Sequence, residues 1–245
     1  MRQVAVSGQV WSYTVTPGKG VPIIFLHGWG RSGSEWVPFA QRLHIATGRP
    51  VYTVDLPGFG GSPIPIVSDI TEYTERFFQW LTYMKLKEIS LVGHSLGGRV
   101  GIVLAATRPE VFEALVLVDP AGVKPRSIRQ TFLRTAAALF RWVPPSIRAR
   151  VVGGIMDEDY RSSPELRTLY RAIVKTELTP YLSRILCPTY VIWGEKDPLL
   201  PLGQTDVYKR LIPDVRIRVV WGAGHDPQLS HAEKLMRILE EIWTF

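Results

Sequence analysis

The sequence predicts an α/β protein with a mainly parallel sheet that helices cover on both faces. Short apolar runs alternate with helical patterns over most of the 245 residues. Strand runs that are separated by helical crossovers are typical of parallel sheets buried on both faces. The alternation stops after Asp119 and resumes at Thr189, so a segment rich in helical patterns interrupts the order of the strands.

Individual elements follow from the spacing of the apolar residues. Apolar or alternating runs predict strands over 10–15, 22–26, 51–54, 88–92, 114–118, 189–193 and 215–220. Apolar residues at three- and four-residue steps predict a helix over 70–84, and the same criterion predicts helices over 35–46, 96–106, 204–211 and 228–243. Because ligands bind at the carboxyl ends of the strands in such sheets, the interrupting segment should cover the site. We therefore expect a core domain of residues 1–120 and 187–245 and a helical cap of residues 121–186.

Composition excludes several classes of protein. Hydrophobic residues make up 46% and charged residues 21%, which is close to globular averages and argues against disorder. The single cysteine, Cys187, excludes an internal disulfide, and no Cys/His cluster has zinc-ligand spacing. The sequence has neither a signal-peptide pattern nor an apolar run of about 18 residues. We expect a cytoplasmic protein without a metal site.

Positive charge is concentrated in the predicted cap. The formal net charge is +7, which we interpret as favouring solubility, with no nucleic acid partner. Seven basic and no acidic residues lie between 120 and 156: Lys124, Arg126, Arg129, Arg134, Arg141, Arg148 and Arg150. Between them, Phe132, Leu139 and Phe140 fall at helical spacing. We expect these three side chains to line a substrate pocket beneath the cap, and binding of a basic amphipathic helix to a membrane surface is the alternative.

A nucleophile is predicted at Ser95, within the segment Gly93-His94-Ser95-Leu96-Gly97. The segment fits the pattern G-x-S-x-G and lies between a predicted strand and a predicted helix. Glycines on both sides permit a sharp turn that exposes the serine hydroxyl at the edge of the sheet.

A serine hydroxyl needs a base, and the base needs an orienting carboxylate. His225 follows the last predicted strand in Gly222-Ala223-Gly224-His225, so its imidazole should lie at the same edge of the sheet. Asp197 follows the strand over 189–193, which gives the chain order Ser95, Asp197, His225. Asp119 also ends a strand and is the rival carboxylate. Asp226 is interpreted as a loop residue.

The oxyanion that forms on attack needs preorganised N–H donors. One predicted donor is the main-chain N–H of Leu96, which follows the nucleophile at a helix N-terminus. The second is the main-chain N–H of Trp29, in the loop after the strand over 22–26. We expect the Trp29 indole to line the substrate pocket.

Together these motifs resemble the α/β-hydrolase superfamily over the whole chain except the insertion. The residues that carry the resemblance are His27-Gly28-Trp29-Gly30, Asp55-Leu56-Pro57-Gly58-Phe59-Gly60-Gly61-Ser62, Gly93-His94-Ser95-Leu96-Gly97-Gly98, Gly194-Glu195-Lys196-Asp197 and Gly224-His225. The resemblance implies eight strands with one antiparallel, a cap after the sixth strand, no cofactor, and triad roles for Ser95, His225 and Asp197.

Within that superfamily the chain is similar to small carboxylesterases and to C–C bond hydrolases of ring-cleavage products. Serine at the nucleophile position, where dehalogenases and epoxide hydrolases carry aspartate, argues against those two branches. Ring-cleavage enzymes often carry tryptophan after the catalytic histidine, whereas this chain has Asp226, and the segment Ser230 to Glu233 is more similar to esterases. We expect hydrolysis of small carboxylic esters of short to medium acyl chain. Cleavage of the C–C bond of a vinylogous diketone acid, and a ligand receptor on a hydrolase fold, are the alternatives.

Overall fold

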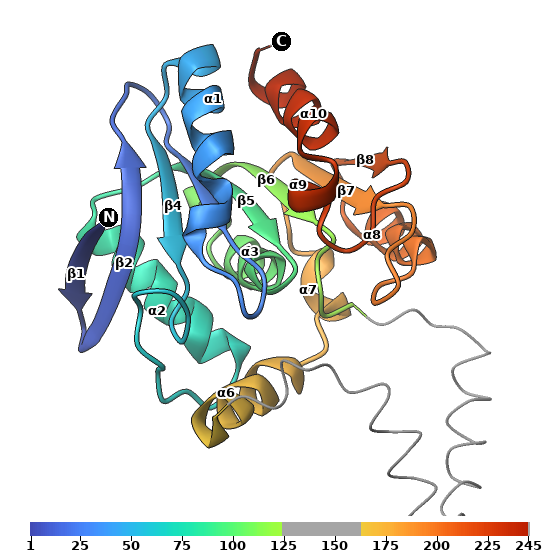
Figure 1. The fold of residues 1–245 in the computed structure, drawn as a ribbon. Coiled ribbons are helices and arrows are strands. Elements are labelled where there is room, and N and C mark those ends of the chain that lie inside the picture. The colour runs from blue at the N-terminus through green and yellow to red at the C-terminus, as the bar shows by residue number, and fades with distance from the viewer. Residues whose placement is uncertain (124–162, 245) are drawn as a thin grey trace, which may run out of the picture.

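The computed structural model describes residues 1–123 and 163–244, and an eight-stranded sheet forms its centre (Figure 1). The strand order is β1-β2-β4-β3-β5-β6-β7-β8. Because β2 pairs antiparallel with both neighbours and the other pairs are parallel, it is the one strand of the sheet that runs in the opposite direction. The strands are β1 (Arg2–Val6), β2 (Gln9–Thr16), β3 (Ile23–Leu26), β4 (Val51–Asp55), β5 (Ile89–His94), β6 (Phe112–Val118), β7 (Thr189–Gly194) and β8 (Val215–Val220).

The first strand is absent from the sequence prediction. Only Val6 of β1 is buried, so the segment lacks the apolar pattern that identifies a strand. A tight turn at Ser7 and Gly8, with φ of 49° and 79°, folds β1 back onto β2. Two consecutive residues with positive φ are typical of the turn that matches the twist of a hairpin.

Helices cover both faces of the sheet (Figure 1). One layer contains α1 (Val37–Thr47) and α10 (Ala232–Thr244), whose apolar side chains pack with those of β3, β5, β6 and β7. The other layer contains α2 (Ile70–Tyr83), α3 (Leu96–Thr107) and α8 (Thr205–Leu211). The described residues also form short 3₁₀ helices at η1 (Gly33–Trp36), η2 (Pro109–Val111) and η5 (Leu202–Gln204).

The C-terminal helix differs from its prediction. A single helix over 228–243 is wrong, because α9 (Pro227–Ser230) ends at Ser230 and α10 begins at Ala232, with His231 between them. The carbonyl of Asp226 accepts hydrogen bonds from the main-chain N–H groups of Leu229 and Ser230 and from the Ser230 hydroxyl. The first turn of α9 is therefore hydrogen-bonded to Asp226, the residue that follows His225.

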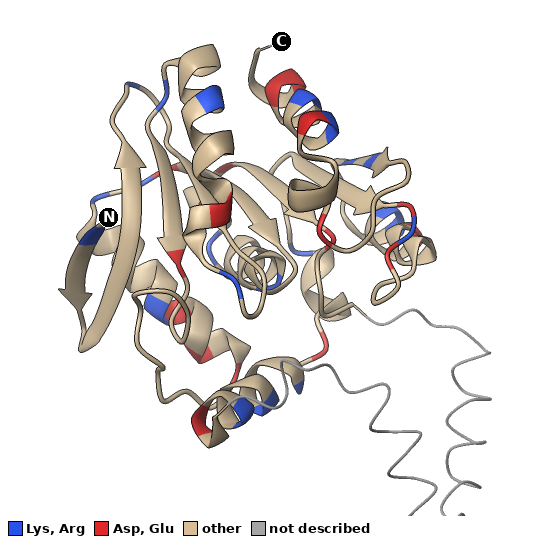
Figure 2. Ribbon diagram, viewed as in Figure 1, with Lys and Arg blue, Asp and Glu red and all other residues tan. Residues whose placement is uncertain are grey.

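The interrupting segment is described in part. Its residues 163–186 form α6 (Pro164–Val174) and α7 (Thr179–Leu182), and Figure 2 shows Lys and Arg along α6. The side chain of Arg99 on α3 donates to the carbonyls of Ile173 and Thr176, both at 2.7 Å, and so fixes the end of α6 to the core. The predicted pocket residues Phe132, Leu139 and Phe140, and all seven basic residues between 120 and 156, lie outside the described residues. No helix in the described part has the length and apolar character needed to cross a membrane.

Candidate active site

Three strand ends bring the predicted nucleophile, base and carboxylate together. Ser95 directly follows β5, Asp197 lies on the loop after β7, and His225 lies on the loop after β8. Because these strands are parallel, their carboxyl ends share one edge of the sheet, where open α/β sheets bind ligands.

The turn at Ser95 is strained and depends on close packing. Ser95 has φ of 47° and ψ of −101°, a conformation that residues with a side chain rarely adopt. A Cβ on Gly93 would lie 2.5 Å from the carbonyl oxygen of Gly97, and one on Gly97 would lie 2.4 Å from that of Leu26. Both glycines are therefore needed for strand, turn and helix to approach this closely, and the turn leaves the hydroxyl at the surface of the sheet edge.

A continuous chain of hydrogen bonds joins the three side chains. His225 Nε2 lies 3.1 Å from Ser95 Oγ, and His225 Nδ1 lies 2.7 Å from Asp197 Oδ2. A carboxylate only accepts, so Nδ1 carries the hydrogen and the neutral ring presents its Nε2 lone pair to the serine hydroxyl. This is the tautomer in which the imidazole can accept the serine proton.

Asp197 is held in its charged form. Burial raises its pKa, but the hydrogen bond from His225 and those from the N–H groups of Leu200 and Leu199 outweigh burial and lower the pKa below its usual value. The two main-chain bonds reach Oδ1 at 2.9 and 2.7 Å. A fixed, ionised carboxylate is suited to stabilise an imidazolium.

Asp119 is a second buried carboxyl group in the same cluster. One of its carboxyl oxygens lies within 4.8 Å of a carboxyl oxygen of Asp197 and of a ring nitrogen of His225. Burial raises the pKa of Asp119 to about 9; the N–H of Gly194, which donates to Oδ1 at 2.9 Å, opposes this increase, and the charge of Asp197 adds to it. The folded protein therefore favours the protonated form of Asp119. These three groups could offer ligands to a metal ion, but His225 and Asp197 already bind each other.

The two predicted oxyanion donors lie beside the nucleophile. Leu96 is the first residue of α3, where main-chain N–H groups have no acceptor within the helix. Trp29 follows Gly28, on which a Cβ would lie 3.5 Å from the Cβ of Ser95. The His27 ring fixes this loop, because Nδ1 donates to the Gly28 carbonyl at 2.7 Å and Nε2 accepts from the N–H of Leu56 at 2.9 Å.

Aromatic side chains form a wall beside this loop. The Trp29 ring lies edge-on to Phe59 at 4.8 Å and to Tyr170 of α6 at 5.1 Å between centroids. The described part of the interrupting segment thus contacts the loop that carries the predicted oxyanion donor. Trp29, placed in the pocket by the sequence prediction, is partly buried in this wall.

A polar cluster around His225 escaped the sequence prediction. His94 Nε2 lies 2.8 Å from the main-chain oxygen of His225, and Gln228 Nε2 lies 3.4 Å from His94 Nδ1. Asp226 is bound to Arg31 at 2.7 Å. A usable signal was present in the sequence, since His94 lies inside the nucleophile motif and Asp226 is adjacent to His225. No motif predicts the hydrogen bond between His94 at the end of β5 and His225 on the loop after β8, which lie 131 residues apart in the chain.

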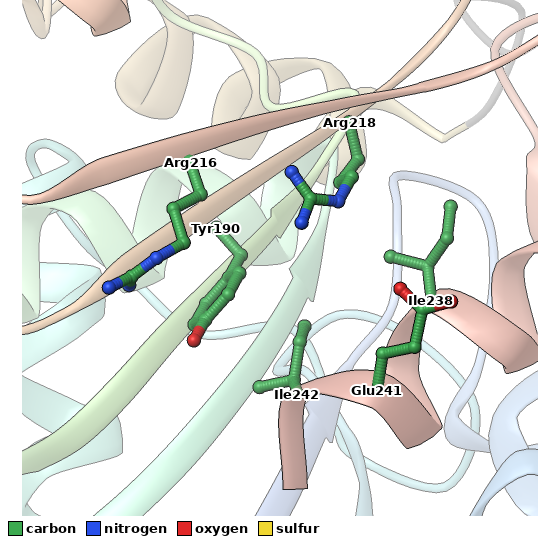
Figure 3. Close-up of a pocket in the computed structure, with 6 residues that line it drawn as sticks. All are labelled: Tyr190, Arg216, Arg218, Ile238, Glu241 and Ile242. Atoms are coloured by element: carbon green, nitrogen blue, oxygen red, sulfur yellow. The ribbon is translucent and has the colours of Figure 1, made fainter. Parts of the chain in front are cut away.

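The pocket in Figure 3 lies elsewhere, between β7, β8 and α10. Its volume of 190 Å³ is below the roughly 300 Å³ at which ligand sites usually begin. None of Ser95, Asp197 and His225 lines it, so we do not assign it to the substrate. The lining residues are Tyr190, Arg216, Arg218, Ile238, Glu241 and Ile242.

Comparisons with known proteins identify the family of the chain. A family model described as the alpha/beta hydrolase family matches residues 23–238. A pimeloyl-[acyl-carrier protein] methyl ester esterase from Aeromonas hydrophila is 26% identical over 92% of this chain and 96% of its own length. A monoacylglycerol lipase from Homo sapiens is 24% identical over 94% of this chain and 77% of its own length.

Solved structures share the fold. An enol-lactonase from Burkholderia xenovorans LB400 has a TM-score of 0.78 at 22% identity, with complete coverage of both chains. A meta-cleavage product hydrolase from Pseudomonas fluorescens IP01 has a TM-score of 0.71 at 20% identity, covering 98% of this chain and 96% of the other. The eight-stranded sheet with its single antiparallel strand is thus the fold of hydrolases with several different substrates.

Proposed function

Because the chain belongs to the α/β hydrolase family, we propose that it hydrolyses small carboxylic esters of short to medium acyl chain through Ser95, His225 and Asp197. The observation that carries this proposal is the unbroken hydrogen-bond chain from Ser95 Oγ through both nitrogens of His225 to Asp197 Oδ2. The esterase and lipase among the relatives support the reaction class.

In the proposed reaction, His225 acts as the base through its unprotonated Nε2. Ser95 Oγ attacks the ester carbonyl carbon while His225 Nε2 takes the hydroxyl proton. The N–H groups of Leu96 and Trp29 stabilise the negative oxygen of the tetrahedral intermediate. The C–O bond then breaks, and the imidazolium gives its proton to the departing alcohol. A water molecule repeats the sequence on the acyl-enzyme, with His225 again as base, and releases the acid and Ser95.

The substrate side of the proposal depends on the aromatic wall and the cap. Trp29, with Phe59 and Tyr170 packed edge-on against its ring, offers apolar surface in the loop beside the nucleophile turn, which favours an apolar acyl group over a charged one. We assign residues 121–186 to a cap over this surface, with Phe132, Leu139 and Phe140 in contact with substrate. Residues 1–120 and 187–245 form the core in this assignment.

Covalent labelling tests the nucleophile. An organophosphonate should modify Ser95 alone, because only an activated serine reacts fast. Ser95→Ala should lose labelling and nearly all turnover of p-nitrophenyl esters, while Ser34→Ala, which changes an exposed serine, should keep both. An adduct on another residue, or full turnover by Ser95→Ala, contradicts the assignment.

A substrate panel tests the reaction class. Esters of increasing acyl length are expected to be turned over, with a preference for short to medium chains. A vinylogous diketone acid in the same panel tests C–C bond cleavage. Faster turnover of that acid than of every ester would replace the proposal with a C–C hydrolase, and ligand binding without any turnover would indicate a receptor.

A further inference from the structure

His94 connects the turn of the nucleophile to the loop of the base. It precedes Ser95, is 1% exposed, and its Nε2 lies 2.8 Å from the main-chain oxygen of His225. Because a carbonyl oxygen only accepts, Nε2 must carry the hydrogen, so the other ring nitrogen, Nδ1, is an acceptor when the ring is neutral. Burial, with the nearby His225 ring adding to it, lowers the pKa of His94 to about 4, which favours the neutral ring.

Gln228 completes the hydrogen bonding of this tautomer. Its Nε2 lies 3.4 Å from His94 Nδ1 and 3.3 Å from Asp226 Oδ1. The two hydrogens of the amide nitrogen match these two acceptors. Asp226 Oδ2 in turn accepts from Arg31 at 2.7 Å. A chain of polar contacts therefore runs from Arg31 through Asp226 and Gln228 to His94 and ends on the main chain of His225.

Packing leaves the His94 ring little freedom. A Cβ on Gly28 would lie 2.7 Å from His94 Nδ1, so the loop carrying Trp29 closes directly on the ring. On another side, the His225 ring lies 5.1 Å away between centroids. The ring thus touches the two loops that must keep fixed positions relative to Ser95.

We propose that His94 is a positioning residue for ester hydrolysis: its Nε2–H holds the main chain of His225 and thereby sets the distance between the imidazole and the Ser95 hydroxyl. The inference rests on the proposed function. Without this bond the His225 loop loses its link to the nucleophile turn, and a displacement of about 1 Å at a reacting pair can lower the rate about 100-fold. The side chain of His94 does not contact the substrate in this role.

Two substitutions separate the hydrogen bond from the packing of the ring. His94→Met has similar bulk and no donor, whereas the amide of His94→Gln can place an N–H near the position of Nε2. We expect His94→Met to lower kcat and the rate of Ser95 labelling by about 10- to 100-fold with KM changed less than about threefold. His94→Gln should regain most of both rates.

The matched control is His44→Met. His44 Nδ1 also bonds to a main-chain oxygen, that of Arg49 at 2.9 Å, but on α1 and away from the site. It should keep kcat within about twofold, since its bond positions no reacting group. Equal kcat for His94→Met and the parent, or no recovery in His94→Gln, overturns the proposal, as does a loss that follows the change in Tm in all three variants.

Two further measurements keep the test decisive. Should His94→Met fail to fold, Gln228→Met removes the donor to Nδ1 without changing the nucleophile motif, and should lower kcat severalfold while KM stays constant; an unchanged kcat overturns the proposal. Nitrogen-15 NMR of the unreacted parent should show His94 as the neutral Nε2–H tautomer from pH 5 to 8, and the Nδ1–H tautomer would overturn it. Absence of any ester turnover and of Ser95 labelling in the parent would instead refute the proposed function, which the NMR result does not depend on.

Discussion

Glu35 is a buried glutamate beside the polar cluster, and its replacement by glutamine tests how burial sets its charge. The side chain is 8% exposed, and the Arg31 guanidinium lies 4.0 Å from one of its carboxylate oxygens. Burial raises its pKa from 4.5 to about 7; Arg31, 4.0 Å away, lowers it and Asp226 raises it further. The folded protein therefore favours the protonated form.

The sign and size of the effect follow from linkage. Because the folded pKa exceeds the unfolded one, the stabilisation from Glu35 is fully present below about pH 4.5 and is lost as the pH rises to about 7. The difference between 4.5 and about 7 corresponds to about 3 kcal/mol of unfolding free energy. Glutamine does not ionise, so Glu35→Gln avoids this loss.

The assay is urea denaturation followed by tryptophan fluorescence at pH 5, 6, 7 and 8. The gain in unfolding free energy of Glu35→Gln over the parent should be about 2 kcal/mol larger at pH 8 than at pH 5. Glu88→Gln, which removes an exposed carboxylate, should change stability by less than about 0.5 kcal/mol throughout. A gain that is constant with pH, or that falls as the pH rises, would refute the reasoning.

Three further predictions address the triad, the cap attachment and the aromatic wall. Asp197→Asn should lower kcat by about 10²- to 10⁴-fold, because the imidazole no longer holds the required tautomer. Asp119→Asn resembles the protonated acid that burial favours and should keep kcat at pH 7 within about threefold. A large loss in Asp119→Asn and a small one in Asp197→Asn would make Asp119 the orienting carboxylate. Arg99→Met should lower the unfolding free energy by about 1–3 kcal/mol in urea denaturation, because the buried carbonyl of Ile173 and the partly buried carbonyl of Thr176 lose their donor, and an unchanged midpoint contradicts this. Tyr170→Ala should lower kcat/KM for medium-chain esters more than for acetate, by the roughly 1–3 kcal/mol that pocket contacts contribute; equal losses for all chain lengths would remove Tyr170 from the acyl site.

Sequence patterns predicted the layered sheet well because its strands are buried on both faces. The central strands β3, β5 and β6 are almost entirely buried and consist mostly of apolar residues, so their places in the chain can be seen without tertiary information. The edge strand β1 was missed for the converse reason, since most of its side chains are exposed. The break at His231 was missed because the apolar periodicity of 228–243 continues through it, while the turn itself is set by the carbonyl of Asp226.

The candidate site also has a part that the sequence predicted and a part that it missed. Ser95, Asp197 and His225 were predictable because each follows a strand with glycines nearby, so local order alone places all three at one edge. The link from His94 to His225 depends on which face of a turn meets which loop, and that is decided by packing. Nor could the sequence show that the pKa of Asp119 is raised, because the increase results from burial by the assembled sheet.

Asp119, at the end of β6, links the turn at Ser95 to the strand that leads to Asp197. Ser95 and Asp119 both have positive φ, of 47° and 41°, a strain of about 1–3 kcal/mol each that the surrounding packing must hold. Main-chain hydrogen bonds join the ends of the three strands: Ser95 N donates to the carbonyl of Val118 on β6 at 3.0 Å, and Asp119 N donates to the carbonyl of Ile192 on β7 at 2.9 Å. Through Oδ1, Asp119 also accepts from Gly194 N, at the end of the strand that leads to Asp197. The end of β6 therefore links the turn at Ser95 to the strand that leads to Asp197, which gives a buried carboxyl group at position 119 a structural role that does not require it to orient the imidazole.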